Sequence, residues 1–242
     1  MTATEFTVPT RRPLLGPGAA TGAAAIALAV AFNVPFSVLG AVFDYPDVLR
    51  RPAGEVLDLF AAGGPMLIIV WYGFMLTALA LAVFAPALAV SKRRIADHPA
   101  LAVGAAVTGA LAGLAQAIGL SRWVFAVPAL AQAHADPAQA AAAEQAFQLL
   151  NAWGGVAIGE HLGQLMTAGF VLQVALIQHG EGARITAPIG MLTAVLLLVG
   201  TGEGLMIALG RSGEVFGLTA IAGFMGLTLW LVATGVGLMR RR

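Results

Sequence analysis

Six long apolar runs constrain the fold of this 242-residue chain more than any other feature. A helix needs roughly 20 residues to cross the hydrocarbon core of a bilayer, and every run reaches that length. The runs are Ala19–Phe43, Gly64–Val90, Ala100–Val127, Phe147–Ile177, Pro188–Leu209 and Val215–Met239. They lack the alternation of barrel strands, and in lipid each backbone polar group must find a partner internally. The sequence therefore predicts an all-α polytopic membrane protein, a six-transmembrane-helix bundle over residues 19–242, after a polar N-terminal tail of residues 1–18.

The composition supports a membrane environment and removes several kinds of chemistry. Hydrophobic residues make up 59% of the chain and charged residues 10%, whereas soluble domains carry about 25% charged residues. The absence of cysteine excludes disulfides, thiolate metal sites and cysteine nucleophiles. A net charge of +1 gives no reason to expect nucleic acid as a partner. The lipid bilayer is the expected partner of this chain.

Basic residues concentrate in alternate connections between the runs. Nine of the thirteen lysines and arginines lie there: Arg11, Arg12, Lys92, Arg93, Arg94, Arg184, Arg240, Arg241 and Arg242. The positive-inside rule places both termini and these connections in the cytoplasm. The opposite side then carries the segment Asp44–Gly63, an Ala- and Gln-rich loop at Ala129–Gln145, and the turn Gly210–Glu214.

The pair Arg11-Arg12 before an apolar run also resembles a twin-arginine export signal. The first run is longer than the apolar region of a signal peptide, and no clear A-x-A cleavage site follows it. Five more runs come after it. We therefore expect a retained first helix that the arginine pair orients.

The segment "DYPDVLRRPAGEVLDLF" after the first run is the most polar patterned stretch outside the runs. From about Pro52, Val56, Leu57 and Phe60 recur at helical spacing, with acidic residues between them. This pattern predicts a short amphipathic helix on the outer membrane surface. Its role is either interfacial packing or a lid over an outward-facing cavity, formed with Asp44, Tyr45, Pro46 and Asp47.

Glycines indicate where the helices approach one another. Gly155, Gly159 and Gly163 form two consecutive G-x-x-x-G steps in the fourth run. Small residues on one helix stripe let backbones come close in lipid. The pattern predicts close helix packing at this stripe, and it carries no information about chemistry.

Polar side chains inside the runs gather in the middle and outer half of the expected bundle. They are Asn33, Gln116, Arg122, Trp123, Glu160, His161, Gln164 and Glu203. Intramembrane ionisable groups are expected to face the bundle interior or a water-filled cavity, next to a partner. One interpretation is structural, with Arg122 paired to Glu160 or Glu203. Two carboxylates and one arginine then leave a charge over, unless one acid is protonated. The other interpretation is a ligand pocket open to the outer side, with these residues as its polar groups.

Ligation of haem b by His161 is a weaker alternative, because a bis-histidine site needs a second histidine at matching depth. His98 and His179 fall at the cytoplasmic ends of runs, and His134 falls in an outer loop. A second Glu-x-x-His motif, which a di-metal site needs, is absent. The sequence therefore predicts no metal site and no cofactor. Glu160 and His161 could still act as an acid and base pair in catalysis.

Three stretches resemble the DUF4386 family, a group of bacterial integral membrane proteins without an established activity. They are "NVPFSVLGAVFDYPDVLRRPAGEVLDLF", "GLSRWVFAVPALA" and "GGVAIGEHLGQL". The resemblance covers nearly the whole six-run region and leaves out the polar tail. It implies a protein of the bacterial inner membrane, and it assigns no catalytic residues.

Three functional hypotheses follow. The chain could bind or transport a small or lipid-soluble ligand in a polar pocket of the outer half. It could be a membrane enzyme acting on a lipid, isoprenoid or quinone, with Glu160 and His161 as candidate catalytic residues. It could also be a structural or regulatory partner of another membrane protein, or of a second copy of itself, with the polar cluster serving packing alone.

Overall fold

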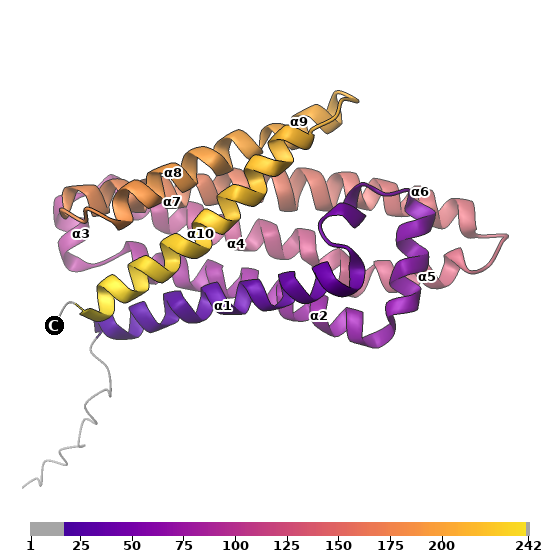
Figure 1. The fold of residues 1–242 in the computed structure, drawn as a ribbon, viewed down its shortest axis with the longest axis horizontal. Coiled ribbons are helices and arrows are strands. Elements are labelled where there is room, and N and C mark those ends of the chain that lie inside the picture. The colour runs from indigo at the N-terminus through magenta and orange to yellow at the C-terminus, as the bar shows by residue number, and fades with distance from the viewer. Residues whose placement is uncertain (1–16, 241–242) are drawn as a thin grey trace, which may run out of the picture.

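The structure is a computed structural model in which residues 17–240 are described (Figure 1). Helices and short connections account for this whole range, which contains no strand. The elements are α1 (Pro17–Phe43), a 3-10 turn η1 (Asp47–Arg50), α2 (Ala53–Ala89), α3 (Lys92–Asp97), α4 (Pro99–Phe125), α5 (Val127–His134), α6 (Ala140–Leu150), a π-helix η2 (Asn151–Leu162), α7 (Gly163–Gly180), α8 (Thr186–Gly200), α9 (Gly202–Ala208) and α10 (Glu214–Arg240). The all-α class is confirmed. The N-terminal tail with Arg11 and Arg12, and the final Arg241 and Arg242, lie outside the described residues.

Five helices of the described chain are long and apolar enough to cross a membrane. They span Gly18–Phe43, Ala53–Ala89, Pro99–His134, Thr186–Ala208 and Glu214–Arg240. The chain is therefore a polytopic membrane protein. The expected fourth span lies within a continuous helical run, Ala140–Gly180, that the π-helix η2 divides. That run is not among the five, so the count of six spans stays a prediction.

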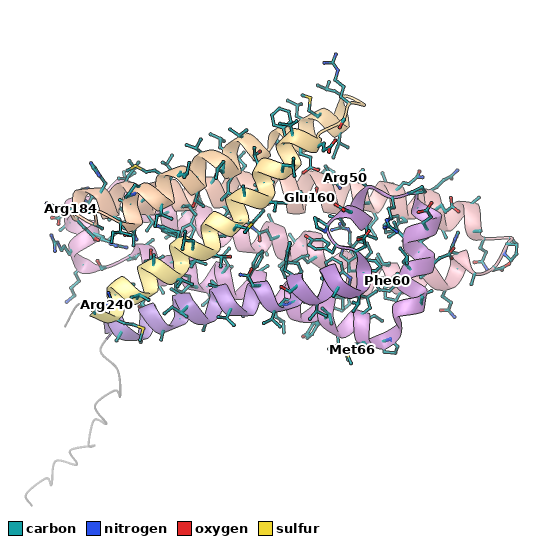
Figure 2. The ribbon with its side chains drawn as sticks, viewed as in Figure 1. Arg50, Phe60, Met66, Glu160, Arg184 and Arg240 are labelled. Atoms are coloured by element: carbon teal, nitrogen blue, oxygen red, sulfur yellow. The ribbon has the colours of Figure 1, made fainter. Side chains whose placement is uncertain are left out.

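The long helices form a closed ring. Around it, α1 packs against α2, α2 against α4, α4 against α7, α7 against α8, α8 against α10, and α10 returns to α1. Figure 2 labels Arg184 and Arg240 at one end of this ring and Arg50 and Glu160 toward the other. These are called the Arg184 end and the Arg50 end below.

Two buried clusters fill different parts of the ring. The cluster toward the Arg184 end contains Phe84, Phe170 and Trp230 among aliphatic side chains. The cluster at the Arg50 end is largely aromatic, and in it Trp71 stacks on Trp123 with 4.8 Å between the ring centroids. Such aromatic pairs contribute roughly 0.5–1.5 kcal/mol beyond the area that they bury. The aromatic cluster holds together the helices that form the Arg50 end.

The expected amphipathic helix is the first part of α2. Val56, Leu57 and Phe60 are buried, whereas Asp58 is exposed, as the spacing predicts. This part runs across the bundle before α2 turns along it (Figure 1). The turn occurs at Gly64, whose φ of 58° lies in the left-handed region that glycine adopts without steric cost. The amphipathic part therefore connects directly to the second span at this kink.

The expected loop Ala129–Gln145 is wrong as a loop, because most of it is helical. Helix α5 extends to His134, α6 begins at Ala140, and a short connection joins them. Alanine and glutamine have high helix propensity, which favours this outcome locally. Both helices also pack on α2, where Ala131 and Ala143 are buried. Tertiary contacts thus extend the helices beyond the apolar runs.

Glycine sets the closest approach between helices at the Arg50 end. A Cβ on Gly119 of α4 would lie 2.6 Å from the Cα of Gly159 in η2, so the two backbones are in contact there. The predicted stripe in the fourth run does pack closely: Gly155 faces Arg122, Gly159 faces Gly119, and Gly163 faces Gln116.

We expect Gly119→Ala to destabilise the protein by about 1–3 kcal/mol, because overpacking against a neighbouring backbone forces the helices apart. Gly73→Ala is the matched control. A Cβ at Gly73 would meet no atom within 4 Å, so this change should be neutral or stabilise by up to about 1 kcal/mol. Thermal unfolding of both variants in the same detergent measures the difference. Equal melting temperatures would contradict the close contact.

Candidate functional site

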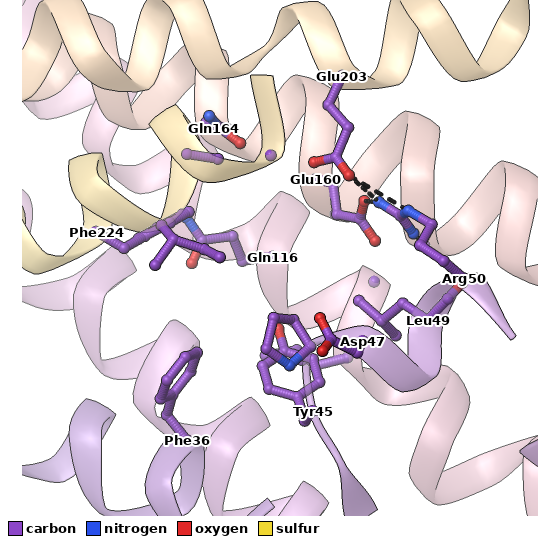
Figure 3. A pocket seen from close by; sticks show the side chains of 18 of the residues that line it. Phe36, Tyr45, Asp47, Leu49, Arg50, Gln116, Glu160, Gln164, Glu203 and Phe224 are labelled. Carbon is purple, nitrogen blue, oxygen red and sulfur yellow. Dashed lines mark hydrogen bonds and ion pairs between the residues drawn. The ribbon is translucent and has the colours of Figure 1, made fainter. Parts of the chain in front are cut away.

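A cavity of about 740 Å³ lies inside the ring toward the Arg50 end (Figure 3). Its walls come from α1, η1, α2, α4, η2, α7, α9 and α10. Ligand pockets in proteins usually enclose about 300–1,000 Å³, so the cavity has the size of a small-molecule site. The Arg184 end, by contrast, is filled by its buried cluster.

Most of the cavity wall is apolar. It includes Phe32, Phe36, Phe74, Phe224, Leu120, Ile221 and Met225. Phe32 stacks on Phe224 with 5.9 Å between centroids, which joins α1 to α10 at the base of the cavity. A ligand with a substantial apolar part would match this wall.

Three charged side chains meet on the cavity wall. Arg50 Nη2 lies 2.6 Å from Glu160 Oε2 and 2.9 Å from Glu203 Oε1, and its Nε also donates to Glu203 at 3.3 Å. Figure 3 shows the two carboxylates reaching Arg50 from different helices. The side chains are 36%, 28% and 23% exposed for Arg50, Glu160 and Glu203. One arginine of η1 therefore connects η2 to α9.

The surroundings perturb two groups in the connection between α1 and α2. Burial alone would lower the pKa of Arg50, but the carboxylates of Glu160 and Glu203 outweigh it and raise that pKa above its usual value. Burial among aromatic rings, aided by the Glu160 charge, raises the pKa of Tyr45 well above its ordinary range. Arg50 thus stays a cation and Tyr45 a neutral phenol at any physiological pH.

Arg122 lines the cavity without making the expected ion pair. Its Nη2 donates to Asn151 Oδ1 at 3.1 Å, and its Nη1 donates to the carbonyl of Gly119. The guanidinium carbon also lies 5.1 Å from the ring centroid of Trp123. The predicted pairing of Arg122 with Glu160 or Glu203 is therefore wrong, because Arg50 binds both carboxylates.

The predicted amides line the cavity with their nitrogens already bonded. Asn33 donates to Thr228 Oγ1 at 2.9 Å, Gln116 to Thr167 Oγ1 at 2.8 Å, and Gln164 to the Leu197 carbonyl at 2.9 Å. Trp123 is fully buried and forms part of the cavity wall. The oxygen atoms of these amides remain as acceptors for a ligand or water.

His161 is the one residue of the predicted pocket that does not line it. Its Nδ1 lies 3.0 Å from the carbonyl oxygen of Thr201, at the break between α8 and α9. Glu160 and His161 therefore face different surroundings, although they are neighbours in the sequence. Of the other histidines, His98 lies beside Gly180, and His134 lies between Asp58 and Glu144.

The predicted lid residues divide into two groups. Tyr45, Pro46 and Asp47 line the cavity, and η1 carries Leu49 and Arg50 onto the same wall. Asp44 lies outside the wall, where it pairs with Arg51. Within the described chain, no group of three or more histidine or acidic side chains is placed to hold a metal ion.

Comparison with known proteins identifies the family. The family model described as "Domain of unknown function (DUF4386)" matches residues 20–235. The chain belongs to the DUF4386 family. Neither a curated protein nor a solved structure matches it. The matched range includes every side chain that lines the cavity of this DUF4386 protein.

Sequence reasoning missed Arg50 and Asn151 in this DUF4386 protein. The charge count of the predicted cluster pointed to Arg50, because Glu160 and Glu203 with Arg122 alone leave one negative charge without a cation. Arg50 lies beside the predicted lid, on the side where arginines are otherwise few. Asn151 gave no signal, because only the fold brings it to Arg122.

We expect Arg50→Gln to destabilise this DUF4386 protein by about 1–2 kcal/mol, a cost between those of exposed and buried ion pairs. The loss leaves two carboxylates facing each other without a cation. Adding Glu160→Gln to this variant should restore part of the stability, whereas the same change alone should reduce it. Such a reversal of sign is the mark of direct coupling between two sites.

Arg51→Gln is the matched control for this experiment. Arg51 pairs with an exposed aspartate outside the cavity, so its loss should change the melting temperature little. Thermal unfolding of all four variants supplies the data. Additive effects of the Arg50 and Glu160 changes would show that the bridge does not couple them.

Proposed function

We propose that this DUF4386 protein binds a small, lipid-soluble ligand in the cavity at the Arg50 end. The observation that supports this best is the combination within one cavity of about 740 Å³: an aromatic and aliphatic wall next to convergent polar groups. Ligand sites typically combine a mainly apolar lining with a few placed polar groups that fix orientation. The apolar wall suits a molecule that dissolves in lipid better than in water.

The proposed location is the inner membrane of a bacterium, with both termini in the cytoplasm. Lys92 and Arg93 flank the same end of the bundle as Arg184 and Arg240 (Figures 1 and 2). The positive-inside rule assigns that end to the cytoplasm. The cavity would then open in the outer half of the membrane, where the bridge from Arg50 holds η1 over it. Loss and renewal of this bridge would let a ligand enter and leave, which is the step that transport requires.

The alternative of an enzyme with Glu160 and His161 as acid and base receives less support from the geometry. Glu160 lines the cavity and is bonded to Arg50, but His161 lies beside Thr201. A general acid and base must both reach the same substrate. A purely structural cluster would explain the bridge from Arg50, but it gives no reason for an open cavity between well-packed helices.

Replacing Ile221 by tryptophan should fill part of the cavity. Ile221 of α10 lies on its wall. The protein is purified in mild detergent, and its bound small molecules are extracted into organic solvent and quantified by mass spectrometry. We expect the wild type to retain a ligand and Ile221→Trp to retain about tenfold less, since a clash of about 1.4 kcal/mol changes binding tenfold.

Leu229→Trp is the control on the same helix. Leu229 is 58% exposed and does not line the cavity, so a larger side chain there extends into the surrounding lipid or detergent. Lipid that coats the outside of the bundle should be equal in the two variants. An equal amount of every extracted molecule in all three proteins would count against a ligand in the cavity.

A further inference from the structure

Arg122 is a buried cation whose guanidinium makes no direct ion pair with a carboxylate of the described chain. It is 6% exposed, and its two terminal nitrogens donate to neutral oxygens of Asn151 and Gly119. Among residues 17–240, no carboxylate lies within ion-pair distance of it. A charge removed from water is costly unless it is paired as well as hydrogen-bonded.

Arg94, the other buried arginine that the structure describes, is paired with a carboxylate. Arg94 is 7% exposed, and Glu181 accepts from its Nε at 2.7 Å and from its Nη2 at 2.9 Å. Such a bidentate pair is the usual solution for a buried guanidinium. Arg122 has the same burial and lacks this solution, which indicates that another molecule supplies the anion.

Four fully buried polar atoms beside the cavity lack a hydrogen-bond partner in the described chain, and three of them are donors. Arg122 Nε and the indole nitrogens of Trp71 and Trp123 have no hydrogen-bond partner in the described chain, whereas Glu160 Oε1 is the unpaired acceptor there. These four side chains all line the cavity. Glu160 and Glu203 already share Arg50, so the three buried donors receive no acceptor oxygen from these two acids.

The sequence makes room for Arg122 at this position. A Cβ on Gly155 would lie 2.6 Å from Arg122 Nη2 and 2.9 Å from Asn151 Oδ1. Only glycine therefore leaves the guanidinium in place. The arrangement depends on a specific residue of the neighbouring helical run, as expected for a built site.

The cavity also reaches the lipid-facing surface between α1 and α10. These helices touch near the Arg184 end, where a Cβ on Gly22 would lie 2.6 Å from the carbonyl oxygen of Gly235. They diverge toward the Arg50 end (Figure 1). Phe36 of α1 and Met225 of α10 line the cavity, and Met225 is 69% exposed. A membrane-dissolved molecule could enter by this side.

We propose that the ligand is an acidic amphiphile: a carboxylate or phosphate head on an apolar tail. Its head oxygens accept hydrogen bonds from Arg122, and its tail lies along the aromatic wall toward α1 and α10. This assignment rests on the proposed function. It specifies in addition that the head group of the ligand is negatively charged. The acidic head pairs with the Arg122 guanidinium as the Glu181 carboxylate pairs with that of Arg94.

Tryptophan quenching by brominated probes tests the assignment, since bromine quenches over a short range. The protein carries Trp153→Phe, because Trp153 is 66% exposed and would report any probe in the surrounding lipid. Trp71 and Trp123 then report the cavity, and Trp230 lies in the buried cluster at the other end. The probes are dodecanoate, dodecyl phosphate, dodecanol and dodecylamine, each brominated on the part of the chain nearest its head group and titrated at equal membrane mole fraction.

We expect one or both acids to quench at about tenfold lower mole fraction than dodecanol, the gain that a charge-assisted hydrogen bond supplies. The two acidic probes distinguish a carboxylate from a phosphate head. Arg122→Gln should abolish the preference for the acids while dodecanol quenches as before, and Arg122→Lys should keep part of it. Arg184→Gln, which removes an exposed arginine at the far end, should change nothing.

Equal quenching by the acids and dodecanol, or stronger quenching by dodecylamine, would overturn the acidic head but leave the proposed function standing. A preference for acids that survives in a folded Arg122→Gln variant would also overturn it. If no probe quenches Trp71 and Trp123, the proposed function itself fails. Should Arg122→Gln not fold, the ranking of the four probes on the parent protein still decides.

Discussion

The fold at the Arg50 end depends on one constraint: charges in a weakly polar bundle must be neutralised by other charges. Glu160 of η2 and Glu203 of α9 both line the cavity, and without a cation between them the two carboxylates would repel. Arg50 removes this repulsion because it reaches both from outside the spans. This single guanidinium of η1 thus connects η2 with α9 beside the cavity.

Side-chain size then decides where the bundle is solid and where it is hollow. Gly22 and Gly235 bring α1 and α10 together toward one end, and Gly119 and Gly159 bring α4 and η2 together at the other. Between them the ring carries large aromatic side chains that stack on one another and leave the centre unfilled. The cavity is thus the result of close contact at the helix crossings combined with divergence of α1 and α10.

Much of this arrangement was readable in the sequence because it depends on local patterns. The apolar runs predicted helices, the Val56–Phe60 spacing predicted the amphipathic part of α2, and the polar side chains of the runs predicted a shared interior, which all of them except His161 line. The partners could not be predicted, because pairing depends on how far each helix extends and turns. Arg50 stands in a connection that was predicted to lie at the membrane surface. The Ala129–Gln145 segment is helical because local propensity and packing on α2 act together.

Counting the charges around Arg122 and Arg50 connects the fold to the proposed ligand. With Arg50 included, the polar cluster contains two arginines and two carboxylates, so its formal charges balance. The negative charges are distributed unevenly, because both carboxylates pair with Arg50 and neither forms an ion pair with Arg122. Moving one carboxylate to Arg122 would break the bridge that holds η1 in place. Under the proposed assignment, an acid that arrives from the membrane pairs this cation while Arg50 keeps both of its carboxylates.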